Sequence, residues 1–225
     1  FDNRHHREEN YMYKKVLTWT LTIGFAGAGF LRAEAPAFSF LQFGVGAHSQ
    51  ALGKAYTAKG GDAGVMSYNP SLLTQSGSPE IYFYHTQYIS KFRYNYGAYV
   101  QPLTRWKSVL GLSLGEYSKG SIDGRDKDGN PTGAFSAADR IITLAYAQKV
   151  SDTFSAGGAL KAVRSEIGSY SSNGAAIDLS GTYNVLQTKV AAALLNIGPK
   201  VKYEDKTSPM PMTLALGAAR NLHRS

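Results

Sequence analysis

Residues 92–101 read FRYNYGAYVQ, and their side chains alternate in character with a period of two. One face would carry Phe92, Tyr94, Tyr96, Ala98 and Val100, and the other Arg93, Asn95, Gly97, Tyr99 and Gln101. Successive side chains of a strand point to opposite faces, whereas a helix repeats about every 3.6 residues. The stretch is therefore predicted to be a β-strand with two unlike faces.

The same alternation recurs along the rest of the chain. It is clear at 109–115, 142–147 and 177–185, and weaker at 81–88, 154–166, 189–198 and 211–222. About eight strands are predicted, several of about 10–12 residues, which is longer than usual in globular proteins and suits tilted membrane-crossing strands. We therefore predict an all-β fold, a transmembrane antiparallel β-barrel. The alternative is a soluble β-sandwich, whose strands also alternate.

The segments between the predicted strands differ in length. They are short near Ser90, at 151–153 and at 186–188, and longer, polar and glycine-rich at 119–138, 168–174 and 199–209. Short turns at one rim and long loops at the other are typical of outer-membrane barrels. Aromatic residues near the strand ends would then form girdles at the two membrane interfaces.

The composition excludes several classes of protein. The 225 residues contain no cysteine, so disulfide scaffolds, cysteine-ligated metal sites and thiol nucleophiles are ruled out. The net charge of +8 is scattered, and no nucleic-acid-binding motif is present, so we expect no nucleic-acid partner. The low charged content of 18% together with 24 glycines and 15 tyrosines favours a β-rich protein of a bacterial envelope.

The first 33 residues carry the pattern of an export signal. Two lysines follow Met12, the uncharged run 16–31 reads VLTWTLTIGFAGAGFL, and Ala33 is a small residue suited to cleavage. We interpret 12–33 as a signal peptide and 1–11 as an upstream translation artefact. The alternative for the apolar run is a buried amphipathic helix.

Residues 34–79 differ from the strands that follow. They are rich in glycine and alanine and lack long alternation. Asp62 is expected to cap a short helix that runs to Tyr68 and ends before Pro70. This segment has too little apolar surface to fold alone, so it is predicted to be a plug packed inside the barrel, with 80–225 forming a partial transmembrane β-barrel.

Several stretches resemble the FadL-like superfamily of outer-membrane proteins. The plug likeness lies in Gly46, Gly53, Ala55, Tyr56, Ala58, the pair 62–63 and residues 68–72. The chain is most similar to the PorV/PorQ branch, in FLQFGVGAHSQALGKAYTA (40–58), HTQYISKFRYNYGAYVQP (85–102), DGNPTGAFSAAD (128–139) and NIGPKVKYEDKTSPMPMTLALGAA (196–219). It departs from the pattern at Ser71, where the family prefers alanine, at His48 for arginine and at Lys54 for methionine.

The resemblance implies a barrel of about 14 strands with an internal plug. A barrel of about eight strands has an interior filled by its own side chains and could not admit such a segment, so we expect the chain to be an N-terminal fragment. The implied function is passage of hydrophobic small molecules across the bacterial outer membrane. The alternative is a type IX secretion system component that binds the C-terminal domains of secreted proteins.

Candidate binding residues lie in the plug and on the strands. The cluster of Phe38, Phe40, Leu41 and Phe43 would line a ligand pocket or pack the plug in the lumen. Asn69 and Pro70 would mark a bend that moves when a ligand enters, or a helix stop whose amide satisfies local backbone groups. Lumen-facing polar residues are predicted at Arg93, Asn95, Asp178 and Asn184. The expected partners are outer-membrane lipid and either a hydrophobic small molecule or secreted protein cargo.

No constellation in the sequence favours catalysis. His85 shares a strand face with Gln87, but the chain lacks a Gly-x-Ser-x-Gly elbow. The acidic stretch 123–130 departs from the spacing of a calcium-binding EF-hand and is interpreted as a surface loop. We therefore expect no enzyme, no metal and no cofactor.

Overall fold

A computed structural model describes residues 35–88, 92–203 and 206–220 of the chain. The chain divides into two compact units, Phe1–Glu34 and Ala35–Ser225, and every described residue belongs to the second. The predicted upstream segment 1–11 and signal peptide 12–33 therefore lie outside the described residues.

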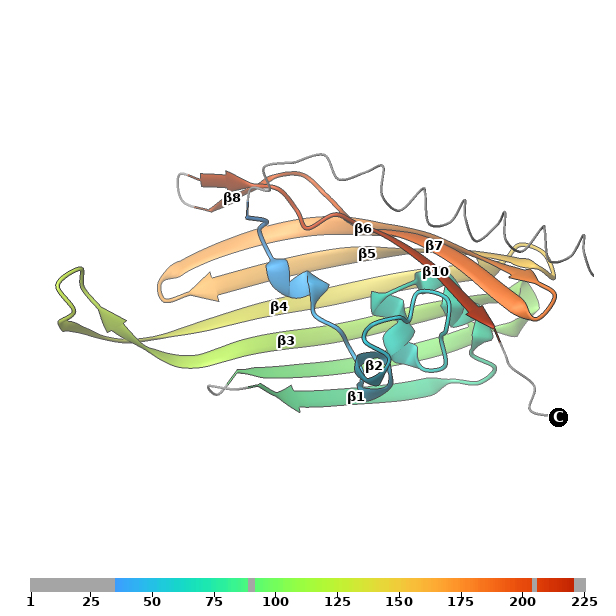
Figure 1. Cartoon of the computed structure of the whole chain (residues 1–225), viewed down its shortest axis with the longest axis horizontal. Coiled ribbons are helices and arrows are strands. Elements are labelled where there is room, and N and C mark those ends of the chain that lie inside the picture. The colour runs from blue at the N-terminus through green and yellow to red at the C-terminus, as the bar shows by residue number, and fades with distance from the viewer. Residues whose placement is uncertain (1–34, 89–91, 204–205, 221–225) are drawn as a thin grey trace, which may run out of the picture. The chain divides into compact units, whose positions relative to one another are not determined.

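Eight strands form one antiparallel sheet in the order β1-β2-β3-β4-β5-β6-β7-β10 (Figure 1). Their bounds are β1 (Glu80–Gln87), β2 (Arg93–Leu103), β3 (Ser108–Arg125), β4 (Pro131–Lys149), β5 (Phe154–Ile167), β6 (Tyr170–Val185), β7 (Thr188–Ile197) and β10 (Thr213–Arg220). A small hairpin of β8 (Val201–Tyr203) and β9 (Lys206–Ser208) separates β7 from β10. The prediction of an all-β, antiparallel, barrel-like sheet of about eight strands is confirmed.

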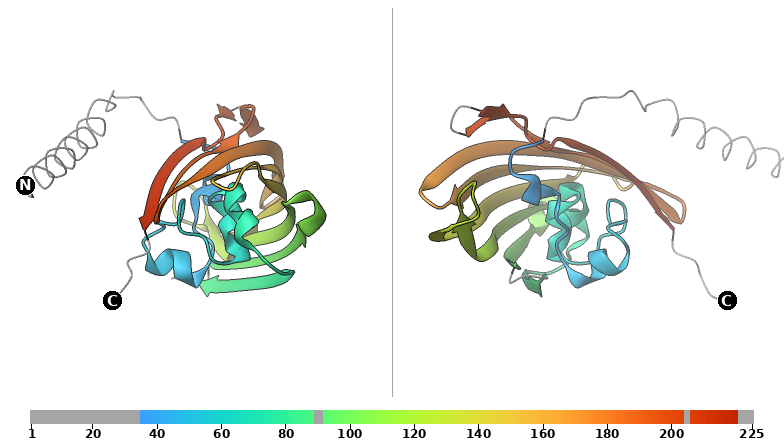
Figure 2. Two further views of the ribbon diagram at one scale, coloured as in Figure 1. Left: turned by 90° about the vertical axis from the view of Figure 1, so that its right-hand side faces the viewer. Right: turned by 60° about the vertical axis from the view of Figure 1, so that its left-hand side comes forward.

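The sheet is strongly curved and open. In the end-on view its strands curl like half of a barrel around the N-terminal segment, residues 35–79 (Figure 2). Its two edges, β1 and β10, are not paired with each other. The curvature gives the sheet a concave face that meets the N-terminal segment and a convex face that does not.

The N-terminal segment contains four short helices: η1 (Ser39–Gln42), α2 (Ala47–Ala51), η2 (Ala63–Ser67) and η3 (Pro70–Gln75). Asp62 caps η2 by accepting a hydrogen bond from the Gly64 amide, as the sequence predicts. Asn69 does more than stop this helix, because it also caps η3. Among the described residues, no helix combines the length and apolarity that crossing a bilayer would need.

Three segments predicted to be loops contain strand residues instead, and one of them is 199–209, which holds β8 and β9. The 119–138 segment continues the β3–β4 pairing beyond a register shift, with Ile122 opposite Phe135, and only 126–130 forms the turn. The resulting hairpin projects past its neighbours (Figure 1). The 168–174 segment shrinks to a turn between β5 and β6. Glycine and charge indicated loops, but paired backbone hydrogen bonds keep the strands extended.

The alternation of short and long connections is also wrong in one place. A turn at 104–107, containing η5 (Thr104–Trp106), joins β2 to β3. The connection from β1 to β2 therefore lies at the same rim as the 126–130 turn. The other rim carries the turns at 104–107, 150–153 and 186–187; we call it the short-turn rim.

The core lies between the N-terminal segment and the concave face. Its largest fully buried side chains include Tyr56, Met66, Leu72, Leu73 and Val100. Helix η3 contacts β3, β4, β5 and β6. The concave side chains beneath it are small, and Ala145 and Ala147 are completely buried. Small residues at these positions give the backbone of η3 room to approach the sheet.

The closest approach is at Gly157 of β5, where an added Cβ would collide with the backbone of Pro70 and Ser71. We expect Gly157→Ala to destabilise the protein by about 1–3 kcal/mol, because the overpacked turn must move away from the sheet. Gly97→Ala is the control, since its Cβ would meet only the Phe83 ring at ordinary contact distance. Urea unfolding of the refolded full chain measures both, and equal stabilities of the two variants would contradict the expectation.

Candidate functional site

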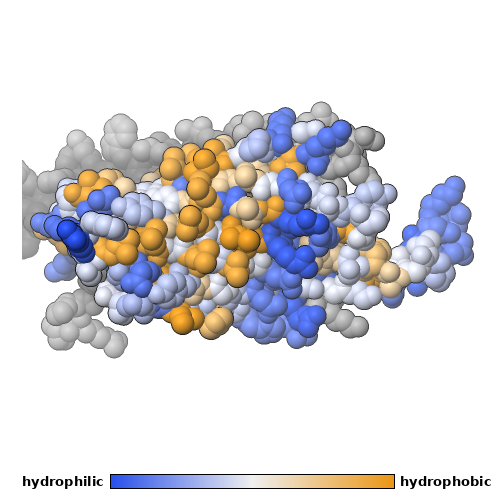
Figure 3. Space-filling view, turned by 180° about the vertical axis from the view of Figure 1, so that it is seen from behind, coloured by the Kyte–Doolittle hydropathy of each residue, from blue (hydrophilic) through white to orange (hydrophobic). Residues whose placement is uncertain are grey.

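The convex face carries a belt of exposed apolar side chains. Each of its large members is at least 39% exposed, and together they span all eight strands. Figure 3 shows these side chains gathered over the middle of the face, with a hydrophilic strip beside them. The belt comprises Ile81, Phe83, Tyr99, Leu110, Leu112, Leu114, Ile142, Leu144, Tyr146, Leu160, Ile177, Leu179, Tyr183, Val190, Leu214 and Leu216. Water-soluble monomers rarely expose an apolar surface of this extent.

A row of polar residues borders the belt. His85, Asn95, Glu116, Arg140 and Arg164 are direct cross-strand partners from β1 to β5. His85 Nδ1 lies 2.7 Å from Asn95 Oδ1, and Arg140 donates to Glu116 at 2.8 Å. Glu166 accepts from Arg140 at 2.7 Å and from Arg164 at 2.8 Å. Hydrogen bonds and ion pairs thus connect the row in two groups: His85 with Asn95, and Glu116 with Arg140 and, through Glu166, with Arg164.

The opposite border of the belt carries tyrosine–glutamine pairs. Tyr99 donates to Gln101 Oε1 at 2.6 Å, and Tyr146 donates to Gln148 Oε1 at 3.2 Å. Both strands run toward the short-turn rim, so both pairs mark the same edge of the belt. Arg140 and Gln148 lie on one strand and enclose a stretch of about 27 Å along it.

The prediction that Arg93 and Asn95 face the interior is wrong, because both side chains lie on the convex face and are exposed. Their neighbours Tyr94 and Tyr96 are buried against the concave side. The strand has an aromatic and a polar face, and alternation alone does not say which of them points inward. Contact with the N-terminal segment decides in favour of the aromatic face.

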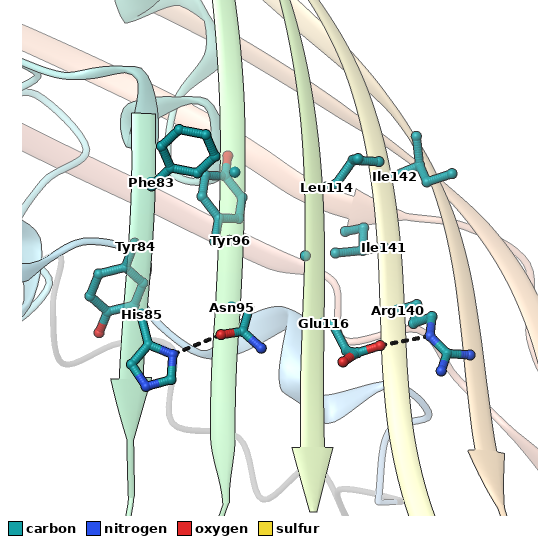
Figure 4. Close-up of a pocket in the computed structure, with 12 residues that line it drawn as sticks. Phe83, Tyr84, His85, Asn95, Tyr96, Leu114, Glu116, Arg140, Ile141 and Ile142 are labelled. Atoms are coloured by element: carbon teal, nitrogen blue, oxygen red, sulfur yellow. Dashed lines mark hydrogen bonds and ion pairs between the residues drawn. The ribbon is translucent and has the colours of Figure 1, made fainter. Parts of the chain in front are cut away.

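Between the belt and the polar row lies a groove on the convex face, with a volume of about 710 Å³. Gly97 leaves space between Phe83 and Leu114, and the pairs His85–Asn95 and Glu116–Arg140 form its polar end (Figure 4). The residues that line it include no serine, threonine or cysteine. His85 therefore meets an amide in this groove rather than a hydroxyl nucleophile.

On the concave face, the turn at Asn69, Pro70 and Ser71 is fastened to β6. Asn69 Oδ1 accepts from the amide of Ser71 at 3.0 Å and from its hydroxyl at 2.6 Å. Asn69 Nδ2 donates to the Thr57 carbonyl at 2.7 Å and to Thr182 Oγ1 at 3.2 Å. The Ser71 amide also donates to Ser180 Oγ at 2.9 Å. We call this set of contacts the Asn69 anchor.

A second network orders the part of the segment before the anchor. Tyr56 donates to Asp62 Oδ2 at 2.8 Å, and Tyr68 donates to Ser49 Oγ at 2.8 Å. Burial raises the pKa of both tyrosines, and for Tyr56 the hydrogen bond to Asp62 and the charge of that carboxylate raise the pKa further. Both phenols therefore remain neutral donors well above neutral pH.

The predicted phenylalanine cluster divides into two environments. Phe38 and Phe40 are buried, with Phe38 packed against Gly174 of β6. Phe43 is 37% exposed and contacts Tyr117 of β3 edge to face, with ring centroids 5.0 Å apart. It borders a pocket of about 490 Å³ whose other walls include Gln50, Lys54, Tyr88, Phe92 and Tyr117. We call this the aromatic pocket.

Asp178 lies on the concave face and is completely buried. Its Oδ2 is 2.6 Å from Lys161 Nζ, and its Oδ1 accepts from the Asn196 amide at 2.7 Å. Asn196 has a left-handed backbone (φ 58°) opposite a register shift in β6. Asp178 thus fixes a bulge in the sheet. Asn184 has the same facing but is exposed near the end of β6.

The acidic turn at 126–130 is explained by its own backbone. Asp126 Oδ1 accepts from the amides of Asp128 and Asn130 at 2.9 Å. The Asn130 bonds, with further backbone donors in the turn, lower the pKa of Asp126. In the part of the chain that the structure describes, no three His, Cys, Asp or Glu side chains are grouped so that they could hold a metal ion.

Comparison with known proteins does not assign the chain to a family. No protein-family model matches the chain, and no curated protein matches it significantly.

Asn69→Ala tests the anchor. The Thr57 carbonyl and the hydroxyls of Ser71 and Thr182 would each lose one hydrogen bond in a buried site, and the two hydroxyls would keep only their bond to each other, so we expect a loss of about 2–4 kcal/mol in unfolding free energy. Amide hydrogen exchange should rise in η3. Asn173→Ala, at an exposed position of β6, is the control and should change stability by less than about 0.5 kcal/mol. Unchanged exchange in η3 would show that the anchor is not needed.

The tyrosine network predicts a loss of stability at alkaline pH. An unfolded chain ionises its tyrosines near pH 10. Because folding raises the pKa of Tyr56, its contribution is complete below about pH 10 and declines above it. Tyr56→Phe should therefore flatten the fall in urea stability between about pH 10 and 12. Tyr170→Phe, at an exposed tyrosine, should keep the wild-type slope; equal slopes in all three proteins would refute the prediction.

Proposed function

We propose that the chain forms part of an outer-membrane β-barrel of the FadL/PorV type that passes hydrophobic small molecules across the bacterial outer membrane. The observation that carries the proposal is the distribution of side chains over the two faces of the sheet. The convex face is apolar and exposed, whereas the concave face holds polar groups and a packed segment. A curved sheet with this distribution suits lipid outside and protein inside.

The borders of the belt support this orientation in a membrane. Ion-paired residues mark one border and tyrosine–glutamine pairs mark the other, as expected where strands leave the apolar layer. The stretch of about 27 Å between Arg140 and Gln148 corresponds to a height of about 20 Å when strands tilt by about 40°. This value is of the order of the apolar layer of the thin bacterial outer membrane.

The N-terminal segment acts as the plug in this proposal. Eight strands leave both sheet edges open around it, so closure of the barrel requires additional strands. The Asn69 anchor holds the η3 end of the segment to the sheet. The region around Phe43 borders the aromatic pocket rather than the tight core.

The aromatic pocket is the proposed entry site for the transported molecule. Its volume is within the range of small-molecule sites, and aromatic walls favour an apolar ligand. It lies at the rim where β1 ends and β2 begins, next to Phe92 and Tyr117. A molecule bound there would pass along the lumen only if the region around Phe43 moves while the anchor holds.

A second candidate is a component of a type IX secretion system that binds the C-terminal domains of secreted proteins. The β3–β4 hairpin favours this candidate, because it extends beyond the neighbouring strands (Figure 1) and ends in a charged turn. In that case the hairpin would contact protein cargo, and the aromatic pocket would have no ligand.

Mass spectrometry of the protein purified gently from its native membrane tests the proposal. We expect an apolar small molecule at near-stoichiometric occupancy, reduced severalfold by Phe43→Ala because the aromatic wall is lost. Phe135→Ala is a matched control, since Phe135 has the same 37% exposure but lies on the hairpin. Secreted proteins bound to a protein with an empty lumen would contradict passage and support the secretion role.

A further inference from the structure

A polar pocket at the short-turn rim is separate from the aromatic pocket and from the groove. It has a volume of about 330 Å³ and lies between the N-terminal segment and the turn that joins β6 to β7. Lys59 and Gln75 reach it from the segment, and Asn184, Gln187, Thr188 and Lys189 from the strands and turn. Every polar side chain in its lining is thus a cation, an amide or a hydroxyl.

The pocket concentrates positive charge without a compensating acid. Lys59 and Lys189 both line this pocket, Lys59 from the N-terminal segment and Lys189 from β7. No aspartate or glutamate lines the pocket. Within the described ranges, neither lysine forms a salt bridge. Two like charges that line one pocket repel each other, and an anion bound between them would offset that repulsion.

The fold brings the backbones of both lysines to this pocket, and the side chain of Lys59 is exposed. Lys189 is the second residue of β7, is half-buried and faces the concave side. Lys59 precedes two glycines with positive φ, Gly60 at 66° and Gly61 at 130°. This backbone conformation is open to glycine and lets the chain turn sharply beside Gln75. The turn brings Lys59 to the pocket that Lys189 enters from the sheet.

We propose that this pocket binds a doubly charged oxyanion of the phosphate type. Two ammonium groups that line one pocket match a dianion, whereas a single carboxylate would leave one of them uncompensated. The amide groups of Gln75, Asn184 and Gln187 and the hydroxyl of Thr188 supply further donors for the remaining oxygens. The phosphate belongs to a soluble small molecule or to a lipid headgroup at this rim. The inference does not depend on the proposed transport function.

Titration calorimetry of the full chain in detergent at pH 8 and constant ionic strength tests the site. Inorganic phosphate is expected to bind with one-to-one stoichiometry, and acetate is expected to bind at least about tenfold more weakly because it carries a single charge. Phosphate binding should also weaken at pH 5, where phosphate groups lose their second charge. Equal binding of acetate and phosphate, or no binding of phosphate, would overturn the proposal.

Lysine variants assign the binding to this pocket. Lys59→Met and Lys189→Met should each weaken phosphate binding about tenfold, which is the effect of losing about one charge-assisted hydrogen bond, and the double variant should abolish it. Lys149→Met is the matched control, because Lys149 is an exposed lysine at the same rim that does not line the pocket. An equal loss in the control would mean general charge attraction and would refute the site.

A competition experiment identifies the source of the phosphate. Nanodiscs containing phosphatidic acid are compared with nanodiscs containing phosphatidylcholine alone, with inorganic phosphate as the probe. Displacement of phosphate only by phosphatidic acid would support the site with a lipid headgroup as its ligand. Undiminished binding in both would support it with a soluble phosphate compound.

Discussion

The seating of the Asn69 turn on β5 and β6 is the constraint on which the rest of the structure depends. A buried amide there bonds a neighbouring backbone and a strand hydroxyl at once, directly above a glycine that leaves no room for a Cβ. This contact requires small and hydroxylated side chains on the part of the concave face beneath the turn. The convex face carries the large apolar side chains that form the exposed belt.

The hydrogen-bonding groups that hold the N-terminal segment lie on the concave face, and the exposed apolar belt lies on the convex face, so the two faces have different roles. The concave face binds the N-terminal segment through hydrogen bonds that are out of contact with solvent, so each is costly to lose. The belt would be an aggregation hazard in water but is matched to a lipid environment. The aromatic pocket and the polar pocket at the short-turn rim lie near opposite rims of the sheet.

Much of this fold could be predicted from the sequence: period-two alternation indicates the strands of the sheet, and Asp62, followed by Pro70 eight residues later, indicates a capped short helix. Alternation does not reveal which face of β2 points inward: Arg93 and Asn95 lie on the convex face, whereas Asp178 and Asn184 lie on the concave face. The glycines and charged residues of 119–138 indicate a loop. The strands there are stabilised by pairing between β3 and β4, which the local sequence does not reveal. The polar pocket at the short-turn rim is lined by residues that are far apart in the chain, so no local sequence motif predicts it.

The measurement that tests the central claim most directly is a cysteine scan of residues 141–147, which the cysteine-free chain makes simple. Each single-cysteine variant would carry a fluorophore and be reconstituted in bilayers with brominated lipid. We predict strong quenching at the convex positions 142, 144 and 146 and weak quenching at the concave positions between them. Uniform quenching along the strand, or quenching at 142, 144 and 146 by a water-soluble quencher instead, would contradict the account.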